Sequence, residues 1–409
     1  MNMGMDRNNY DRYQEIFEYY RNIYDLPLIK TNFYQDDYRA MNYCEERDFV
    51  ALVVPFGDPS GNLANKIVVQ NNLVSYTKMY SDLIGGSARP DRDFLSSAIE
   101  IAKKKANLRS LEEFTPIALI ENTFTYEKKQ QSHYGIVFMA RIPKGRSLGK
   151  DVVSKSINEK VYFANPHNQV LFELAKKYVE NYKTNRILQD EIKFSRKLGL
   201  KDIKNKKKKF LNDNNIDLKD YYEFKKSIVR EIKRTAPKSI MDIACGDDDI
   251  IYDFLKISNN IKVFANDIAL AYLENYHYSK KEHTKIMFSN LNAVELPFKP
   301  GTIDVMFCKN LLHHLSRADR KKLITRCLKI CKTMIVVEIL CYKEQNDSGK
   351  ILHDKFYGEI LKETKNKEYL SGKQMDELFS DPYIEKQSDT EVETQNGKYR
   401  YVWLTAKNS

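Results

Sequence analysis

The spacing of hydrophobic positions changes along the chain and predicts two folded regions joined by helices. Residues 9–24 place aromatic residues and isoleucine at helical intervals. Short apolar runs follow, and we expect buried strands at 49–56 (FVALVVPF) and 132–143 (SHYGIVFMARIP), with a helix over 93–107 between them. This mixture predicts an α+β module in the N-terminal half.

The stretch from 165 to 235 is predicted to be mostly helical. Residues 168–182 (NQVLFELAKKYVENY) are strongly amphipathic, and the segment at 201–215 (KDIKNKKKKFLNDNN) is rich in lysine. A charged tract of this kind is a natural boundary between two folded regions.

From residue 237 onwards, apolar strands alternate with helical segments. We expect strands at 239–245, 261–268, 302–310 and 333–340. Alternation at this spacing indicates βαβ units and a parallel sheet, and therefore the α/β fold class. The end of the chain departs from the pattern, because Asn396-Gly397 lies between two strand-like runs and is a hairpin signal. The sheet is therefore predicted to finish with an antiparallel hairpin.

Composition narrows the class of protein. The 409 residues are 42% apolar, which is enough to build cores. The longest apolar runs have seven or eight residues and the N-terminus has no apolar signal core, so we expect a cytoplasmic protein without a membrane span. The six cysteines lack the paired spacing of a zinc site, and no metal is predicted. The net charge of +11 is concentrated at 201–215 and 225–234, which leaves open a solvated helical linker or a polyanion-binding surface.

The first strand of the C-terminal half runs into a turn that has the composition of a ligand-binding loop. In a doubly wound sheet the ligand lies at the carboxyl ends of the first strands, and small residues such as Ala244 and Gly246 let the backbone approach it. Asp267 follows about twenty residues later, the offset at which a carboxylate reaches ribose hydroxyls. The aspartates at 247–249 would repel a pyrophosphate. A ligand with a ribose and a cationic sulfonium avoids this repulsion, so the electrostatics favour S-adenosylmethionine over a dinucleotide.

Three stretches of this half resemble class I S-adenosylmethionine-dependent methyltransferases over residues 237–407. They are IMDIACGDDD at 240–249, VFANDIA at 263–269 and NAVELPFKPGTIDVMFCKNLLHHL at 292–315. The resemblance implies a Rossmann-like sheet and S-adenosylmethionine as cofactor. Asp248 stands where the family usually has a glycine, and Asn292 where an aspartate is usual. The cofactor-binding positions implied are Asp242, Ala244, Gly246, Asp248, Asp267, Ile268, Asn292, Ala293, Cys308, Lys309 and Asn310.

Candidate catalytic and substrate residues follow the fourth and fifth strands. His313 and His314 lie near the carboxyl end of the fourth strand, where a histidine serves either as a base or as a packing residue. His353 and Tyr357 lie in an insert that could face the substrate. Glu338 ends a buried strand, and the sequence alone offers it no more than a capping role.

The N-terminal half resembles a Nudix domain over residues 45–145. The stretch GGSARPDRDFLSSAIEIAKKKANL at 85–108 has the order of a Nudix box: two glycines, a loop, a helix with paired small residues and a closing turn. The positions of the family's magnesium-binding glutamates hold Arg92, Ile101, Lys104 and Lys105, and these cannot build a site for a hard cation. We therefore expect no pyrophosphate hydrolysis. Either the domain is a scaffold, or Arg89, Arg92, Lys104 and Lys105 bind a phosphorylated ligand without cutting it.

The sequence thus predicts four parts and a leading function. The parts are an N-terminal helical extension (1–44), a hydrolytically inactive Nudix-like domain (45–160), a Lys-rich helical connector (161–235) and a methyltransferase domain (236–409). The leading interpretation is a methyltransferase for a small-molecule or nucleotide-linked acceptor. The alternatives are an RNA methyltransferase whose basic connector contacts phosphates, and a non-catalytic regulatory protein that senses S-adenosylmethionine or a phosphorylated ligand.

Overall fold

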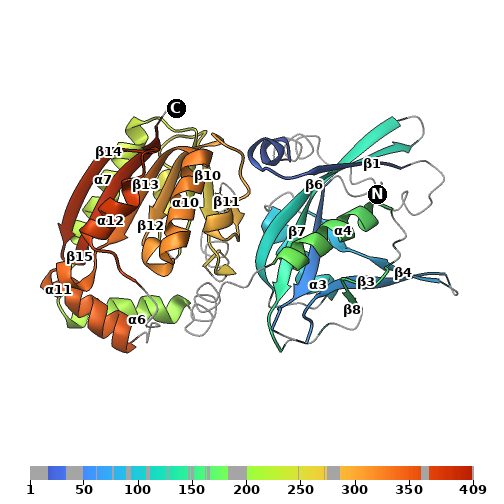
Figure 1. Cartoon of the computed structure of the whole chain (residues 1–409), viewed down its shortest axis with the longest axis horizontal. Helices are drawn as coiled ribbons and strands as arrows, with labels where there is room; N and C mark the ends of the chain where they lie inside the picture. The colour runs from blue at the N-terminus through green and yellow to red at the C-terminus, as the bar shows by residue number, and fades with distance from the viewer. Residues whose placement is uncertain are drawn as a thin grey trace, which may run out of the picture. The chain divides into compact units, whose positions relative to one another are not determined.

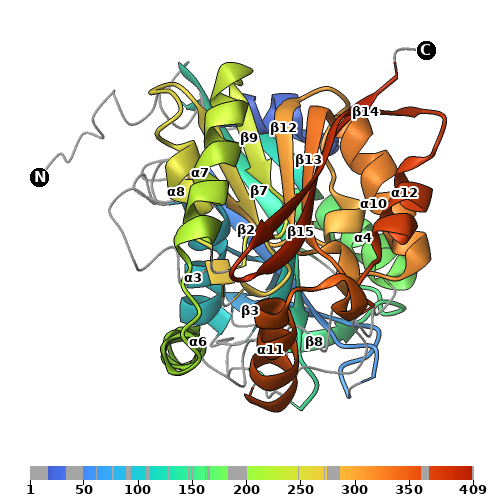
Figure 2. The same cartoon turned by 90° about the vertical axis from the view of Figure 1, so that its left-hand side faces the viewer.

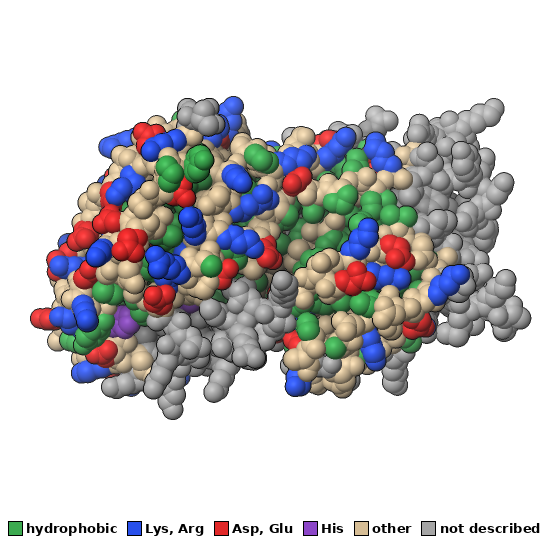
Figure 3. All heavy atoms as spheres, in the orientation of Figure 1, with side chains coloured by type: hydrophobic (Ala, Val, Ile, Leu, Met, Phe, Trp, Pro, Cys, Tyr) green, Lys and Arg blue, Asp and Glu red, His purple; other side chains and the backbone are tan. Residues whose placement is uncertain are grey.

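The computed structural model divides the chain into two compact units, residues 1–184 and 185–409 (Figures 1 and 2). Charged side chains of both signs are interspersed on the surface drawn in Figure 3. None of the described helices is both long and apolar enough to cross a membrane. The structure describes residues 17–33, 49–60, 62–75, 78–88, 94–106, 111–126, 129–145, 148, 152–161, 163, 166–182, 200–246, 248–270, 272–273, 286–360 and 368–407.

The described part of the first unit is built on an eight-stranded mixed sheet. Its main path runs β1-β6-β7-β2-β3-β4, with β5 paired to β2 and β8 paired to β3. Two of the pairings, β1 with β6 and β2 with β7, are parallel. The strands are β1 Leu28–Phe33, β2 Phe49–Gly57, β3 Lys66–Ser75, β4 Lys78–Asp82, β5 Ile84–Ser87, β6 Glu112–Tyr126, β7 Lys129–Ile142 and β8 Val152–Ser156.

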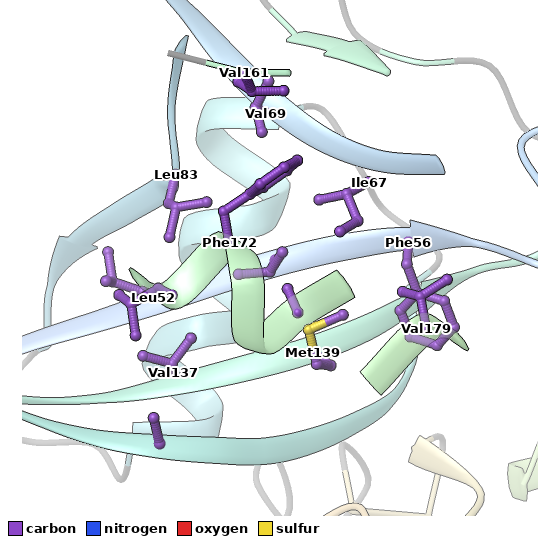
Figure 4. Close-up of a cluster of buried hydrophobic side chains, with 14 of the residues drawn as sticks. Leu52, Phe56, Ile67, Val69, Leu83, Val137, Met139, Val161, Phe172 and Val179 are labelled. Atoms are coloured by element: carbon purple, nitrogen blue, oxygen red, sulfur yellow. The ribbon is translucent and has the colours of Figure 1, made fainter. Parts of the chain in front are cut away.

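Helix α4 (Pro166–Asn181) covers one face of this sheet. Its apolar residues Leu171, Phe172, Ala175 and Val179 pack against alternate residues of β2, β3, β6 and β7 (Figure 4). The short helix α3 (Phe94–Ala106) packs against β2 and β5 instead. The strands expected at 49–56 and 132–143 and the helix expected at 93–107 are found as β2, β7 and α3. Of the helix expected at 9–24, residues 17–23 are helical and residues 9–16 lie outside the described residues. The predicted helical extension over 1–44 is wrong for residues 28–33, which form β1 because they pair with β6.

The second unit contains a seven-stranded sheet in the order β11-β10-β9-β12-β13-β15-β14 within the described residues. All neighbours from β11 to β13 are parallel, whereas β15 runs antiparallel to both β13 and β14. The predicted terminal hairpin is therefore confirmed. The strands are β9 Ser239–Asp242, β10 Lys262–Asn266, β11 Ile286–Ser289, β12 Ile303–Lys309, β13 Cys331–Ile339, β14 Ile384–Thr394 and β15 Gly397–Ala406.

Helices cover both faces of this second sheet (Figure 2). Side chains of β15 alternate between the two faces: Tyr401 contacts α7, whereas Arg400 binds the carbonyl of Gly372 and the carboxylate of Asp376 in α12. The α-helices are α6 Leu200–Asp213, α7 Lys219–Arg234, α8 Ile250–Phe254, α10 Arg317–Ile330, α11 Asp347–Ile351 and α12 Gly372–Phe379. The remaining turns of helix are η2 Ala293–Glu295, η3 Leu312–His314, η4 Tyr342–Glu344 and the π-helix η5 Leu352–Ile360.

The helical stretch between the sheets divides between the two units. Helix α4 packs on the first sheet, whereas Phe210 and Leu211 of α6 pack with Leu352 and Phe356 of η5 in the second unit. Helix α7 buries Phe224, Lys225, Ile228 and Ile232. The unit boundary at residue 184 precedes the Lys-rich tract.

Candidate functional site

The candidate site lies at the carboxyl ends of β9, β10 and β12. Strand β9 is central: the chain runs from it to β10 and β11 on one side, and then crosses to β12 and β13 on the other side. Such a switch in strand order opens a crevice at the carboxyl ends of the strands, where open α/β sheets bind ligands.

The turn after β9 is held over the sheet by backbone hydrogen bonds. The amide of Ile243 donates to Phe307 (3.0 Å) and that of Cys245 donates to Asn266 (3.0 Å). Gly246 has φ +53°, a left-handed conformation that favours glycine, although a Cβ there would meet no atom within 4 Å. Backbone conformation, not lack of space, therefore explains the glycine. Ala244 is half-buried beside it.

Asp267 joins this turn to the end of β10. Its Oδ2 accepts a hydrogen bond from the amide of Gly246 (2.9 Å), and its Oδ1 accepts one from the amide of Ala269 (2.8 Å). The sequence predicted a ribose-binding role for this carboxylate, and the structure places it at the predicted edge with Ile268 half-buried next to it. A carboxylate oxygen can accept more than one hydrogen bond, so both oxygens of Asp267 can still accept a hydrogen bond from a ligand hydroxyl.

Asp242 provides a test of the fit between this site and S-adenosylmethionine. It is 2% exposed, and its Oδ1 accepts no hydrogen bond from any described residue. Burial raises the pKa of Asp242 to about 7, against the opposing effect of Lys309. A buried carboxyl oxygen without a donor suits a ligand that carries an ammonium group, as the methionine end of this cofactor does. The residues present therefore fit the cofactor: Asp242, Gly246 and Asp267 would hold it.

A network of buried amides that the sequence analysis missed orders the neighbouring strand ends. The side chain of Asn266 donates to the carbonyls of Ile243 (3.1 Å) and Leu291 (3.0 Å) and accepts from Ser289 (2.9 Å). Asn290 donates to the carbonyl of Asp267. The signal was present, because both strands change from apolar residues to asparagine where they end.

Asn292 and Ala293, two of the predicted cofactor-binding residues, follow β11. The Asn292 side chain accepts a hydrogen bond from the amide of Val294 (3.1 Å) and caps η2, while Ala293 is buried. The predicted residues at the end of β12 differ in their surroundings. The thiol of Cys308 is fully buried, whereas Asn310 is half-buried with φ +52°.

Two lysines bind the aspartate that replaces the usual glycine. Asp248 forms ion pairs with Lys225 of α7 and with Lys309 at the end of β12. Lys309 also donates to the hydroxyl of Tyr221 (2.8 Å). Sequence analysis did not identify Lys225, although its position on the apolar face of α7 was a detectable signal.

The predicted catalytic histidines lie next to a buried carboxylate. Nδ1 of His313 lies 2.6 Å from Oε1 of Glu338. The other carboxylate oxygen of Glu338, Oε2, accepts a hydrogen bond from the amide of Leu312 (2.8 Å). Glu338 is fully buried and His313 is 5% exposed. The ring centroid of His314 lies 4.1 Å from that of His313. Glu338 thus does more than cap a strand, since it fixes the orientation of the His313 ring.

Aromatic rings continue outward from His313. Tyr369 stacks on it at 4.5 Å with an interplanar angle of 16°, and His353 meets the edge of Tyr369 at 4.1 Å. The structure therefore brings the predicted substrate residue His353 close to the predicted catalytic residue His313. Tyr357 lies in η5, but its side chain is outside the described part.

The predicted phosphate-binding residues are only partly described. Arg89 and Arg92, and the side chain of Lys105, lie outside the described residues. Lys104 is exposed and forms an ion pair with Glu100 of the same helix (2.6 Å). Among the residues that the structure does describe, no group of three or more His, Cys, Asp and Glu side chains is arranged to hold a metal ion.

The strand order, the glycine turn and the acidic strand end together define a class I S-adenosylmethionine-dependent methyltransferase domain. Residues 240–334 match the family model described as a methyltransferase domain. This match confirms the predicted enzyme class and the predicted cofactor, S-adenosylmethionine. A search of curated proteins found no match.

Solved structures with likeness to the chain include several methyltransferases. Magnesium protoporphyrin IX methyltransferase (ChlM) from Synechocystis PCC 6803 with bound SAM is 9% identical in sequence, and the TM-score is 0.38. The match covers 56% of this chain and 100% of that chain. The pyocyanin biosynthetic protein PhzM is 11% identical, with a TM-score of 0.33 and coverages of 41% and 50%. The mitomycin 7-O-methyltransferase MmcR is 14% identical, with a TM-score of 0.34 and coverages of 48% and 60%. The chain thus spans half the length of PhzM, and the class rests on the domain match rather than on these likenesses.

Proposed function

We propose that the second unit transfers the methyl group of S-adenosylmethionine to an oxygen of a small-molecule or nucleotide-linked acceptor. The contact between His313 and Glu338 carries this proposal. A carboxylate accepts hydrogen bonds, so Glu338 favours the tautomer of His313 with the proton on Nδ1 and the lone pair on Nε2. A histidine oriented in this way is suited to remove the proton of a weakly acidic hydroxyl.

Each group of the pair has a defined task in this reaction. When bound, S-adenosylmethionine would supply an electrophilic methyl group, whose bond to the sulfonium sulfur breaks as the acceptor oxygen bonds to it, leaving S-adenosylhomocysteine. His313 takes the hydroxyl proton as the acceptor oxygen forms its bond to carbon, and Glu338 stabilises the imidazolium that results. The burial of both side chains strengthens their interaction, because little water screens it.

We further propose that the acceptor binds beside Tyr369 and His353. The two rings lie edge to face, and the ring of Tyr342 is 6.1 Å from His353 with its hydroxyl donating to Asp354 (2.9 Å). Aromatic walls with a few polar groups favour a flat, partly apolar acceptor. This arrangement supports the small-molecule interpretation.

The test is methyl transfer by the purified full chain from S-adenosylmethionine to a panel of phenols, hydroxy acids and nucleosides, followed by mass spectrometry. We expect a product with one added methyl, and a loss of about 10²-fold or more in kcat for Glu338→Gln. Glu385→Gln, the same change at an exposed glutamate of β14, is the matched control. Transfer that is unaffected by Glu338→Gln would refute the role of the pair. Tight cofactor binding without turnover of any acceptor would favour a regulatory protein.

For the first unit we propose a Nudix-like module that lacks hydrolase activity and acts as a scaffold or ligand-binding domain. The support is local: the glycine pair Gly85-Gly86 lies in β5, which pairs with β2, and helix α3 follows. The exposed position of Lys104, where that family places a metal ligand, also supports it. Release of phosphate from nucleoside diphosphate derivatives with magnesium would refute the proposed lack of hydrolase activity.

The exposed face of α7 supports an RNA acceptor as a second candidate. Lys226, Arg230 and Lys233 are exposed along it, together with Tyr222 at 52% exposure. Basic side chains with an aromatic ring suit a nucleic-acid backbone and base. Affinity for a short RNA that falls steeply with salt would favour this candidate, and its absence at low salt would exclude it.

A further inference from the structure

Three charged side chains are gathered at the turn after β9, nearly withdrawn from water. Asp248 of the turn contacts both Lys225 and Lys309, and the three side chains are 14%, 11% and 15% exposed. The lysines reach the turn from different elements, α7 and the end of β12. Because α7 precedes the 240–334 domain match, the helix adds a residue that the matched segment does not contain.

Tyr221 of α7 contacts both lysines. The amino group of Lys309 lies 5.5 Å from the ring centroid of Tyr221 and donates to its hydroxyl, and that of Lys225 lies 5.8 Å from the same ring. Burial lowers the pKa of Lys225, against the opposing effect of Asp249. Two ammonium groups are therefore positioned in advance around one carboxylate, which is the arrangement of an anion receptor.

Among the groups of S-adenosylmethionine, only the α-carboxylate is anionic. The ribose and the adenine are neutral, and the sulfonium and the ammonium group are cationic, so none of them attracts a pair of lysines electrostatically. The buried carboxyl oxygen of Asp242, which accepts no hydrogen bond from the described residues, lies at the end of the strand that leads into this turn and suits the ammonium group next to that carboxylate. The turn thus offers receptors of both signs for the amino-acid end of the cofactor.

We propose that Lys225 and Lys309 bind the α-carboxylate of S-adenosylmethionine and that Asp248 occupies this receptor when the cofactor is absent. Binding then exchanges one carboxylate for another, so the lysines are never left buried and unpaired. The exchange weakens affinity for the cofactor, because Asp248 competes for the same donors. It also sets specificity, since a nucleoside that lacks the amino-acid carboxylate cannot displace Asp248. The inference rests on the cofactor, and it holds whichever acceptor is methylated.

Titration calorimetry with two ligands tests this proposal without measuring catalysis. S-adenosylhomocysteine carries the carboxylate, and 5′-methylthioadenosine lacks the whole amino-acid end. We expect Lys309→Met and Lys225→Met each to weaken S-adenosylhomocysteine at least tenfold while changing methylthioadenosine less than threefold. Asp248→Asn should tighten S-adenosylhomocysteine several-fold, and this gain should vanish in the Asp248→Asn, Lys309→Met double variant.

Controls separate a receptor from a structural ion pair. Lys332→Met removes a lysine that pairs with Asp304 at the opposite, amino end of the strands (2.6 Å) and should leave both affinities unchanged. Lysine variants that weaken both ligands equally, or an Asp248→Asn variant that binds S-adenosylhomocysteine no more tightly than wild type, would overturn the proposal. Wild-type protein that binds neither ligand would overturn it together with the choice of cofactor.

Discussion

Replacing Asp242 by asparagine should remove a pH-dependent cost to the stability of the second unit. In the folded unit, burial raises the pKa of Asp242 to about 7, and the nearby Asp267 adds to the rise. In the unfolded chain the same carboxyl titrates near its ordinary value of 3.8. A carboxyl with a higher pKa when folded holds its proton more tightly in the folded state. Its favourable contribution is therefore complete below the unfolded pKa and is lost as the pH rises to about 7.

The size of the effect follows from the two pKa values. Three pKa units at 1.36 kcal/mol each correspond to about 4 kcal/mol in the free energy of unfolding. Between pH 5 and pH 8 roughly 3 kcal/mol of this would be lost, because part of the change occurs below pH 5. Asp242→Asn cannot ionise, so the variant should escape this loss.

Urea unfolding followed by tryptophan fluorescence provides the assay. Trp403 is the single tryptophan of the chain and lies in β15, so its signal reports on the second unit. The wild-type free energy of unfolding should fall by roughly 3 kcal/mol more than that of Asp242→Asn between pH 5 and 8. Asp304→Asn is the control: its pKa is lowered, so it is ionised in both states across this range and its curve should stay parallel to wild type. Parallel curves for wild type and Asp242→Asn would refute the reasoning.

Three further predictions concern single side chains. Arg400→Met removes the ion pairs with Asp376 (2.5 Å) and Asp389 (2.6 Å) and should lower the free energy of unfolding of the second unit by about 2–3 kcal/mol. The Trp403 fluorescence transition should then occur at a lower urea concentration, and an unchanged midpoint would contradict the prediction. Phe172→Ala opens a cavity beneath α4 and should cost the first unit about 3–5 kcal/mol, seen by circular dichroism as an earlier transition while that of Trp403 stays in place. Burial raises the pKa of the thiols of Cys308 and Cys327 well above their ordinary value, so both should resist alkylation until the unit unfolds, and modification of either in native protein would show that the core opens readily.

Much of the second sheet was predictable because its signals are local. Strands such as β12 are buried on both faces and read as continuous apolar runs, and the hairpin turn is marked by Asn396-Gly397. Pairing between strands that are far apart in the sequence has no such local signal. Strand β1 pairs in parallel with β6, about ninety residues further on, and nothing in its short sequence LIKTNF points to that partner.

The candidate site shows the same division between local and distant signals. The composition of the turn and the acidic strand end identified Gly246 and Asp267, whose offset is a feature of the sequence itself. The partners of Asp248 and His313 could not be predicted from the sequence. Lys225 reaches Asp248 through the packing of α7, and Glu338 reaches His313 through the order of the strands. Which of several possible charges meets a given residue is decided by the tertiary fold.

The outer strand of the second sheet also limits what this unit can assemble with. Seven consecutive residues of β14, from Glu385 to Glu391, are exposed, and acidic or basic side chains recur among them. The pairing with β15 shifts between Lys386 and Ser388, which bends the free edge. Another strand that approached this edge would meet charge and an irregular backbone, so the sheet is protected against growth by addition of a strand from a second molecule. The same protection applies while the chain is still folding, when an open edge is most exposed to aggregation.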